Sequence, residues 1–278
     1  MVEKSIILVT WDFTEVSENA LMHAQIAAKR LRTNVALLHI VKKESDIKPA
    51  EERLHGVIAD KYSDYNPKPE ALVLTGNIFT TITEAADEHG AKMVFMGTHG
   101  IKGTQKLFGS WALKVIAHSK VPFVVVQGAP PENFDFNDIV FPLNYRKENK
   151  ESLNWISFFS RYFGSKIHVF KAKHTDPAFV KGIESNIMFL AKNFKAKGIE
   201  YIMEEAESEK EFARNVVEYS KKINANAIFV MTTKDIGITD YMLGAHEQYI
   251  IANQYGIPVV CVNPKPPKFG GSFSTSGS

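Results

Sequence analysis

Residues 5–12 read SIILVTWD, a short apolar run rich in β-branched side chains that ends at an aspartate. Such a run is typical of a buried β-strand. The residues that follow have a helical period, because Leu21, Ala24, Ala28 and Leu31 recur at spacings of three and four. We therefore expect a strand followed directly by an amphipathic helix.

This strand–helix unit recurs along the whole chain. In the first half we expect strands at residues 5–10, 35–41, 71–76, 92–97 and 121–127. In the second half we expect them at residues 138–144, 166–172, 199–205, 227–233 and 257–263. Further helices are expected over about 44–64, 82–90, 109–118, 149–163, 177–197, 211–225 and 244–254. Equivalent positions lie close to 130–135 residues apart, so the sequence predicts a tandem repeat of one strand–helix pattern.

Alternating strands and helices predict right-handed crossovers and parallel sheets that are covered on both faces. The predicted fold class is α/β, with two tandem doubly wound domains that each hold a five-stranded parallel sheet flanked by helices. The predicted boundaries are 1–128 for the first domain, 129–137 for a linker, 138–264 for the second domain and 265–278 for a disordered Gly/Ser-rich tail. The apolar last strands of the two halves should cover each other, because exposed apolar edges aggregate.

Composition and charge exclude several functions. The chain has 278 residues, of which 45% are hydrophobic and 23% charged, as is usual for globular proteins. A net charge of +2 predicts no strong binding of nucleic acid. The single cysteine, Cys261, excludes an intrachain disulfide and argues against a zinc cluster. No apolar run is long enough for a membrane span, and no signal-peptide pattern precedes the first strand, so we expect a cytoplasmic protein.

A glycine-rich segment follows the expected fourth strand. Residues 96–116 read MGTHGIKGTQKLFGSWALKVI and end in an expected helix. Glycines let backbone N–H groups approach an oxyanion, and a helix start adds unpaired N–H groups with a positive dipole end. The segment therefore predicts a phosphate cradle, although it matches neither the Walker nor the Rossmann pattern.

Two residues at the ends of other strands extend this prediction. Asp12 could accept a hydrogen bond from a ribose hydroxyl, and Val41 could offer backbone N–H and C=O groups to adenine. The alternative interpretations are a helix N-cap for Asp12 and core packing for Val41. His39 is expected to satisfy a hydrogen bond at a strand end. Trp11 has two possible positions, in the adenine pocket or in the core between sheet and helix.

Together these segments resemble the universal stress protein family. The resemblance rests on ILVTWDFTEVSENAL, LLHIV and VFMGTHGIKGTQKLFGSWALKVI followed by VPFVVVQ, and it is strong in the first copy and faint in the second. It implies the adenine nucleotide alpha hydrolase-like fold and an ATP site, with Mg²⁺ on the phosphates. The implied site residues are Asp12 near the ribose or adenine, Val41 at the adenine, and Gly97, Gly100, Gly109 and Ser110 around the phosphates.

The second copy departs from this motif. Thr232 and Asp235 stand where the first two glycines would be, and Ala245 replaces the serine. A carboxylate at a phosphate site repels the ligand, so no nucleotide is expected there. Asn144 falls opposite Asp12, and Lys171 falls near the Val41 position.

Three functions follow from these patterns. The first is a tandem universal stress protein that regulates a stress response, with one ATP site in residues 1–127. The second is a scaffold or partner-binding module that has lost the site. Trp11 favours this second function, as do the eight residues between Gly100 and Gly109, where the family has nine. The third is a slow ATPase, for which no catalytic constellation is evident. We expect a monomer or a homodimer of tandem chains.

Overall fold

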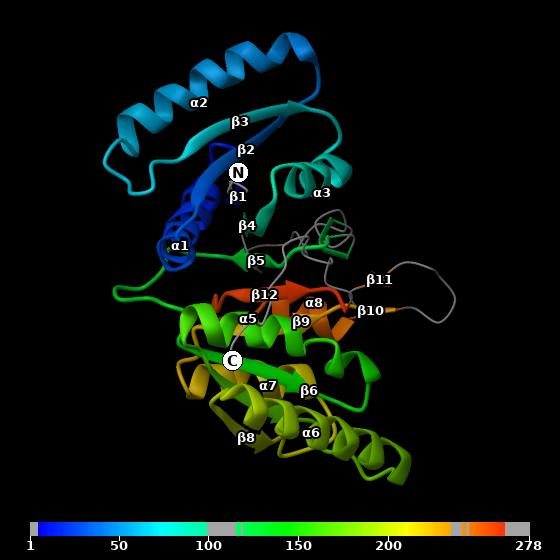
Figure 1. Cartoon of the computed structure of the whole chain (residues 1–278). Helices are drawn as coiled ribbons and strands as arrows, with labels where there is room; N and C mark the ends of the chain where they lie inside the picture. The colour runs from blue at the N-terminus through cyan, green and yellow to red at the C-terminus, as the bar shows by residue number, and fades with distance from the viewer. Residues whose placement is uncertain (1–4, 99–114, 118, 235–240, 243–244, 265–278) are drawn as a thin grey trace, which may run out of the picture.

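One ten-stranded sheet runs through the part of the chain that the structure describes. The computed structural model describes residues 5–98, 115–117, 119–234, 241–242 and 245–264. Its strands follow the order β3-β2-β1-β4-β5-β12-β9-β6-β7-β8. The first half of the chain forms the upper part of Figure 1 and the second half the lower part, with the sheet continuous between them.

Each half contributes five parallel strands, all close to their predicted positions. The strands of the first half are β1 (Ile6–Thr10), β2 (Asn34–Val41), β3 (Glu70–Thr75), β4 (Ala91–Gly97) and β5 (Phe123–Val126). Those of the second half are β6 (Asp138–Leu143), β7 (Lys166–Lys171), β8 (Tyr201–Glu205), β9 (Ala227–Met231) and β12 (Val259–Val262). Within each half every pairing of the ten-stranded sheet is parallel, which confirms the predicted fold class.

The helices also follow the repeat. The first half has α1 (Glu15–Leu31), α2 (Ile47–Lys61) and α3 (Ile78–Glu88). The second half has α5 (Leu153–Phe163), α6 (Pro177–Lys197), α7 (Phe212–Lys222) and α8 (Ala245–Ile251). Short 3-10 turns, η1 (Glu44–Asp46) and η2 (Lys147–Lys150), precede α2 and α5. Residues 115–117 are helical, and most of the helix predicted over 109–118 lies outside the described residues. No helix in the described ranges is long and apolar enough to cross a bilayer.

Local signals in the sequence set the ends of these helices. The Asp176 side chain accepts a 2.7 Å hydrogen bond from the Ala178 N–H and so caps the start of α6, where Pro177 takes the first position. Gly198, with a φ of 64°, ends the same helix. Helix α3 begins four residues before its predicted start, because the Asn77 carbonyl already accepts the N–H of Thr81 at 2.9 Å.

The two halves meet along their last strands. β5 and β12 pair antiparallel, with Val125 opposite Val259 and Phe123 opposite Cys261. This confirms the expectation that these apolar strands cover each other. Because the pair is antiparallel while all other neighbours in the sheet are parallel, the halves are related by a pseudo-two-fold axis between β5 and β12.

Two equivalent amide side chains fasten this junction. Gln127 follows β5 and Asn263 follows β12. Asn263 Nδ2 lies 3.0, 3.0 and 2.5 Å from the carbonyl oxygens of Ile116, Ala117 and Ser119. Gln127 Nε2 lies 3.2 and 3.0 Å from those of Ile251 and Asn253. Each half therefore binds the carbonyl end of the last helix of the other half.

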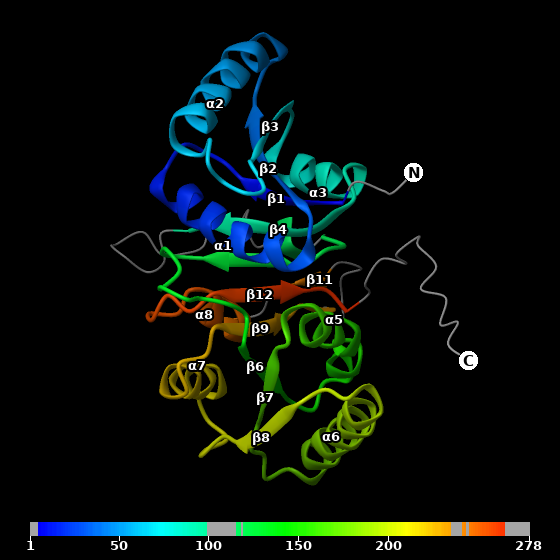
Figure 2. The same ribbon diagram turned by 60° about the vertical axis from the view of Figure 1, so that its left-hand side comes forward.

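The sheet separates two cores. Figure 2 shows α1 and α2 on one side of the first half and α3 on the other, with α5 and α6 opposite α7 and α8 in the second half. One core, the α1 face, contains buried side chains of α1, α2, α5 and α6, such as Leu21 and Phe159. The other core, the α3 face, contains those of α3, α7 and α8, such as Ile82 and Val216.

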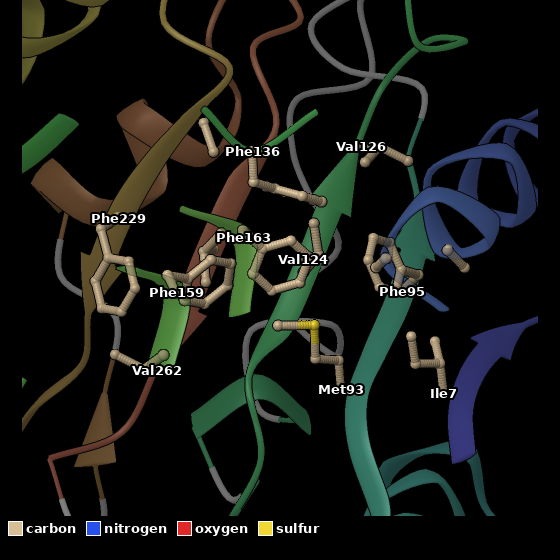
Figure 3. Close-up of a cluster of buried hydrophobic side chains, with 14 of the residues drawn as sticks. Ile7, Met93, Phe95, Val124, Val126, Phe136, Phe159, Phe163, Phe229 and Val262 are labelled. Carbon is tan, nitrogen blue, oxygen red and sulfur yellow. The ribbon is translucent and has the colours of Figure 1, made fainter. Parts of the chain in front are cut away.

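The predicted linker is part of the α1 face. Phe136 is fully buried, with its ring centroid 6.5 Å from Phe95 of β4 and 5.1 Å from Phe163 of α5 (Figure 3). Phe134 packs edge-on against His23 of α1 at 4.7 Å. These aromatic contacts join the two halves, so residues 134–136 act as core and not only as a connection.

Candidate functional site

A pocket of about 210 Å³ opens at the carboxyl ends of β1, β2 and β4. This is where parallel sheets of doubly wound proteins hold their ligands. Its lining comes from the ends of the three strands, the start of α1 and the start of α3. The lining residues are Thr10, Trp11, Asp12, Val16, Ser17, Leu38, His39, Ile40, Ile78, Ile82, Met96 and Gly97.

The indole of Trp11 does not fill this pocket. Side chains alternate along a strand, so Val9 and Trp11 share the α1 face while Leu8 and Thr10 share the α3 face. The Trp11 ring packs edge-on against Tyr62 at 6.0 Å and is 3% exposed. The pocket lies toward α3, so the structure supports the core position for Trp11, which borders the pocket with its backbone.

Asp12 lies exposed at the mouth of the pocket. Its Oδ1 accepts hydrogen bonds from the N–H of Thr14 at 3.1 Å and from the Thr14 hydroxyl. Phe13 between them has a φ of 65°. Asp12 thus forms the turn that leads into α1, whereas the N-cap position itself is held by Thr14. Both bonds are to Oδ1; among the described residues Oδ2 has no hydrogen-bond partner, and Asp12 is exposed.

Val41 does not point its backbone at the pocket. In a parallel ladder, alternate residues direct their N–H and C=O groups to opposite neighbours. The Val41 carbonyl accepts the Gly76 N–H at 3.1 Å, toward β3, whereas the Leu38 carbonyl accepts the Trp11 N–H at 2.8 Å, toward β1. Ile40 lies two residues after Leu38, so its N–H and C=O groups point toward β1, as those of Leu38 do. The last residue of β1, Thr10, pairs with Leu38, so no residue of β1 pairs with Ile40.

The backbone groups of Ile40 therefore face the end of β1, where the pocket lies. The Val41 side chain is buried on the α1 face, as the packing alternative predicts. Ile40 thus lines the same pocket as Asp12 and Gly97, and Val41 does not. The sequence contains no signal for this shift, because the phase of a ladder depends on where the neighbouring strand ends.

Gly97 has a packing role. A Cβ at this position would lie 2.0 Å from the carbonyl oxygen of Val16 and 2.4 Å from its carbon. The first turn of α1 therefore approaches β4 so closely that only glycine fits. Gly97 also borders the pocket, so one residue both seats α1 and forms part of the wall.

His39 satisfies a strand-end hydrogen bond, as predicted. Its Nδ1 lies 2.7 Å from the Trp11 carbonyl oxygen, and because a carbonyl can only accept, Nδ1 carries the proton. The ring packs edge-on against Phe13 at 4.9 Å, and Phe13 lies under the guanidinium of Arg53 at 3.7 Å. These contacts stabilise the turn at Asp12 from the side opposite the pocket.

The second half has the same turn but a much smaller pocket. Asn144 Oδ1 accepts the Arg146 N–H at 2.9 Å, as Asp12 does from Thr14. The pocket beside it measures about 60 Å³. Asn149 donates to Asn144 at 2.7 Å, and Arg146 forms an ion pair with Glu247 at 3.4 Å. Polar side chains of the protein itself therefore occupy this edge.

The hydrogen-bond register corrects one equivalence between the halves. Gly97 pairs with the last residue of β5, and Met231 pairs with the last residue of β12. Thr232 donates its N–H to β12 just as Thr98 does to β5. The counterpart of Gly97 is therefore Met231 and not Thr232. Glycine is not required there, since α5 begins ten residues after β6 whereas α1 begins five residues after β1.

Four of the residues singled out from the sequence lie outside the described residues. They are Gly100, Gly109, Ser110 and Asp235. Of the predicted site, the structure thus brings Asp12 and Gly97 to one pocket. It adds Thr10, Ile40 and Ile78, which the sequence analysis did not select.

The fold and this pocket define a doubly wound protein with a ligand pocket at the carboxyl edge of its first sheet. The model of the Universal stress protein family matches residues 5–127. The first half of the chain is therefore similar to the universal stress protein family, and the second half repeats the fold. No curated protein sequence matches the chain significantly.

Solved structures that match almost the whole chain have the same tandem fold. A universal stress protein from Archaeoglobus fulgidus DSM 4304 is 18% identical, with a TM-score of 0.72 over 95% of this chain and 100% of that one. A putative universal stress protein from Pseudomonas aeruginosa UCBPP-PA14 is 13% identical, with a TM-score of 0.64 over 94% of each chain. A functionally unknown protein from Pseudomonas aeruginosa PAO1 is 15% identical, with a TM-score of 0.62 over 95% and 93%. At these identities the likeness concerns the fold.

Proposed function

We propose that this protein is a tandem universal stress protein whose first half binds an adenine nucleotide, and that the bound nucleotide regulates a stress response. The observation that carries the proposal is the difference in volume between the two equivalent pockets. The first measures about 210 Å³ and the second about 60 Å³. Among the described residues, the carboxyl edge of the first half therefore has more space for a ligand than that of the second half.

The lining of the larger pocket suits a nucleoside. Leu38, Ile82 and Met96 give apolar walls for a flat base. The backbone N–H and C=O of Ile40 can hydrogen bond the edge of that base, the role that the sequence analysis gave to Val41. At the mouth, the free oxygen of Asp12 can accept from a ribose hydroxyl.

The phosphates would then lie toward the segment that follows Gly97. The sequence of this segment, with its glycines at 100 and 109 and the serine at 110, suits an oxyanion. Mg²⁺ bound with ATP would bridge phosphate oxygens and need few protein ligands. We assign no hydrolytic step to this site.

In the second half, we propose a structural role. Its carboxyl edge is occupied by the Arg146–Glu247 pair and by the asparagines around Asn144. Its last strand pairs with that of the first half. The second half would thus complete the sheet that the nucleotide-binding half needs.

The proposal is tested by thermal unfolding of the full chain with and without ATP and Mg²⁺. A ligand at one hundred times its dissociation constant should stabilise the native state by about 2.7 kcal/mol. Ile78→Trp, at the first residue of α3, should fill the pocket and remove this stabilisation.

The matched control is Phe212→Trp. Phe212 is the first residue of α7 and borders the smaller pocket, so it is the counterpart of Ile78. This variant should keep the full response to ATP. No stabilisation of the wild type at millimolar ATP, or equal loss in both variants, would contradict the proposal and favour the scaffold function.

A further inference from the structure

We propose that the hydroxyl of Thr10 determines which base the pocket accepts, by hydrogen bonding to a ring nitrogen of the nucleotide. Thr10 is the last residue of β1, the strand between β2 and β4. This inference rests on the proposed function and adds to it a specificity-determining residue that the sequence analysis did not select.

Thr10 lies on the floor of the pocket. By strand alternation its side chain shares the α3 face with Leu8, whereas Val9 and Trp11 point to the other core. Its partner in the ladder is Leu38 of β2, which also lines the pocket. Thr10 therefore lies on the middle strand of the pocket floor, with β2 on one side and β4 on the other.

The walls around this threonine are apolar. The other side chains that point into the pocket from the strands and from α3 carry no hydrogen-bonding group; they are Leu38, Ile40, Ile78, Ile82 and Met96. Trp11 and His39 border the pocket but direct their rings to the α1 face, where both contact Phe13. Among the described residues, Thr10 therefore supplies the only polar side-chain group on the floor.

The hydroxyl of Thr10 has no protein partner within the described ranges, and Thr10 is only partly buried. Other threonines and serines near the pocket are engaged: Ser17 donates to the Thr14 carbonyl at 2.8 Å, and Thr14 itself bonds Asp12. A hydroxyl can donate and accept. A ligand that displaces water from an apolar pocket must restore the hydrogen bond of this hydroxyl or leave it unpaired.

The spacing along β1 fits a nucleoside. Thr10 and Asp12 are two residues apart, about 7 Å along an extended chain, with Thr10 on the floor and Asp12 at the rim. A nucleoside with its ribose at Asp12 would lay its base over Thr10. A base with a ring nitrogen facing the Thr10 hydroxyl then binds through a hydrogen bond. A base with a C–H group at the same place leaves the hydroxyl unpaired and is disfavoured.

The inference is tested by calorimetric titration of four proteins with ATP and with its 1-deaza, 3-deaza and 7-deaza analogues. The proteins are the wild type, Thr10→Val, Thr10→Ser and Thr80→Val. Thr10→Val keeps the shape of the side chain and removes the hydroxyl, and Thr10→Ser keeps the hydroxyl. Thr80→Val makes the same change on α3, at an exposed residue that does not line the pocket.

We expect Thr10→Val to bind ATP about tenfold or more weakly, with Thr10→Ser and Thr80→Val within about threefold of the wild type. We also expect the wild type to lose about tenfold with one deaza analogue, and Thr10→Val to bind that analogue as it binds ATP. Unchanged ATP affinity in Thr10→Val, or a deaza preference that survives in it, would overturn this inference alone. No binding of ATP by the wild type would overturn the proposed function, and this inference with it.

Discussion

The two halves of this protein have the same strands in the same order but differ at the edge where ligands bind. Each uses a side-chain oxygen after its first strand, Asp12 or Asn144, to accept the N–H two residues on. One edge keeps a pocket of about 210 Å³ and the other about 60 Å³. The comparison teaches that the turn is a requirement of the fold, whereas the pocket depends on the residues that follow the strands.

The largest effect is expected where the halves differ at the end of the fourth strand. Gly97→Ala would force a Cβ against the Val16 carbonyl, which is backbone and cannot rotate away. We expect a loss of about 3 kcal/mol or more in the free energy of unfolding, at the upper end for overpacked sites. Met231→Ala at the equivalent place removes part of a half-buried side chain and should cost about 1–2 kcal/mol. Urea unfolding measures both, and a Gly97→Ala protein as stable as the wild type would contradict the close approach of α1.

Acid should weaken the first half through His23. Burial lowers the pKa of His23 from 6.5 to about 4, although its Nε2 bonds the Gly128 carbonyl at 3.2 Å. Because the folded-state pKa lies below that of the unfolded chain, its contribution is complete above pH 6.5 and is lost as the pH falls through 4. We expect a loss of roughly 3 kcal/mol between pH 7 and pH values below 4.

The control for this pH dependence is His23→Gln, which keeps an N–H donor for Gly128 and does not titrate. Its unfolding free energy should change less between pH 6.5 and 4 than that of the wild type. Identical pH profiles for the two proteins would show that His23 is not buried in its neutral form.

The junction between the halves should respond unequally to equivalent changes. Asn263→Ala removes the amide donor that lies within hydrogen-bond distance of three backbone carbonyls, of which only that of Ile116 keeps another donor, the Ser119 N–H, and Asn263 is 8% exposed. Gln127→Ala removes the donor to two backbone carbonyls, and Gln127 is half-buried. We expect losses of about 2 and about 1 kcal/mol in unfolding free energy. If both variants unfold like the wild type, the amides do not fasten the halves.

The last expected effect concerns the affinity for ATP, at the turn itself. Asp12→Asn keeps an oxygen for the Thr14 N–H and removes the charge, so ATP affinity should fall about tenfold, as for a charged hydrogen bond made neutral. Asn144→Asp is the reverse change in the second half, where the acceptor role toward Arg146 can persist. Calorimetry should find no second ATP site in this variant. A new site there would mean that the carboxylate, and not the space, decides binding.

Most of the fold could be predicted from the sequence because it depends on local patterns. Apolar runs gave the ten strands of the sheet to within two residues at either end, and the predicted span of α6 matches its bounds of Pro177–Lys197. The burial of Phe136 could not be predicted, since it depends on side chains from β4 and α5 that are distant in sequence. The antiparallel pair β10 (Thr233–Lys234) and β11 (Tyr241–Met242) was also missed, because two-residue strands carry no periodic signal.

The candidate site could be predicted only in part. Asp12 and Gly97 were identifiable because Gly97 ends β4 and Asp12 comes two residues after the end of β1. The backbone of Ile40, and not that of Val41, faces the pocket because of where β1 stops pairing with β2, and no sequence motif indicates that point. Thr10 lines the pocket because side chains alternate along β1, and Ile78 lines it because α3 begins beside it. Both could be identified only from the assembled sheet. The boundaries of the two domains remain predictions.

The central claim, one nucleotide site per chain in the first half, is tested most directly by calorimetric titration of the wild-type chain with ATP and Mg²⁺, with Ile78→Trp and Phe212→Trp beside it. The account predicts a stoichiometry of one, abolished by Ile78→Trp and kept by Phe212→Trp. A stoichiometry of two, or binding that survives Ile78→Trp and is lost in Phe212→Trp, would contradict it.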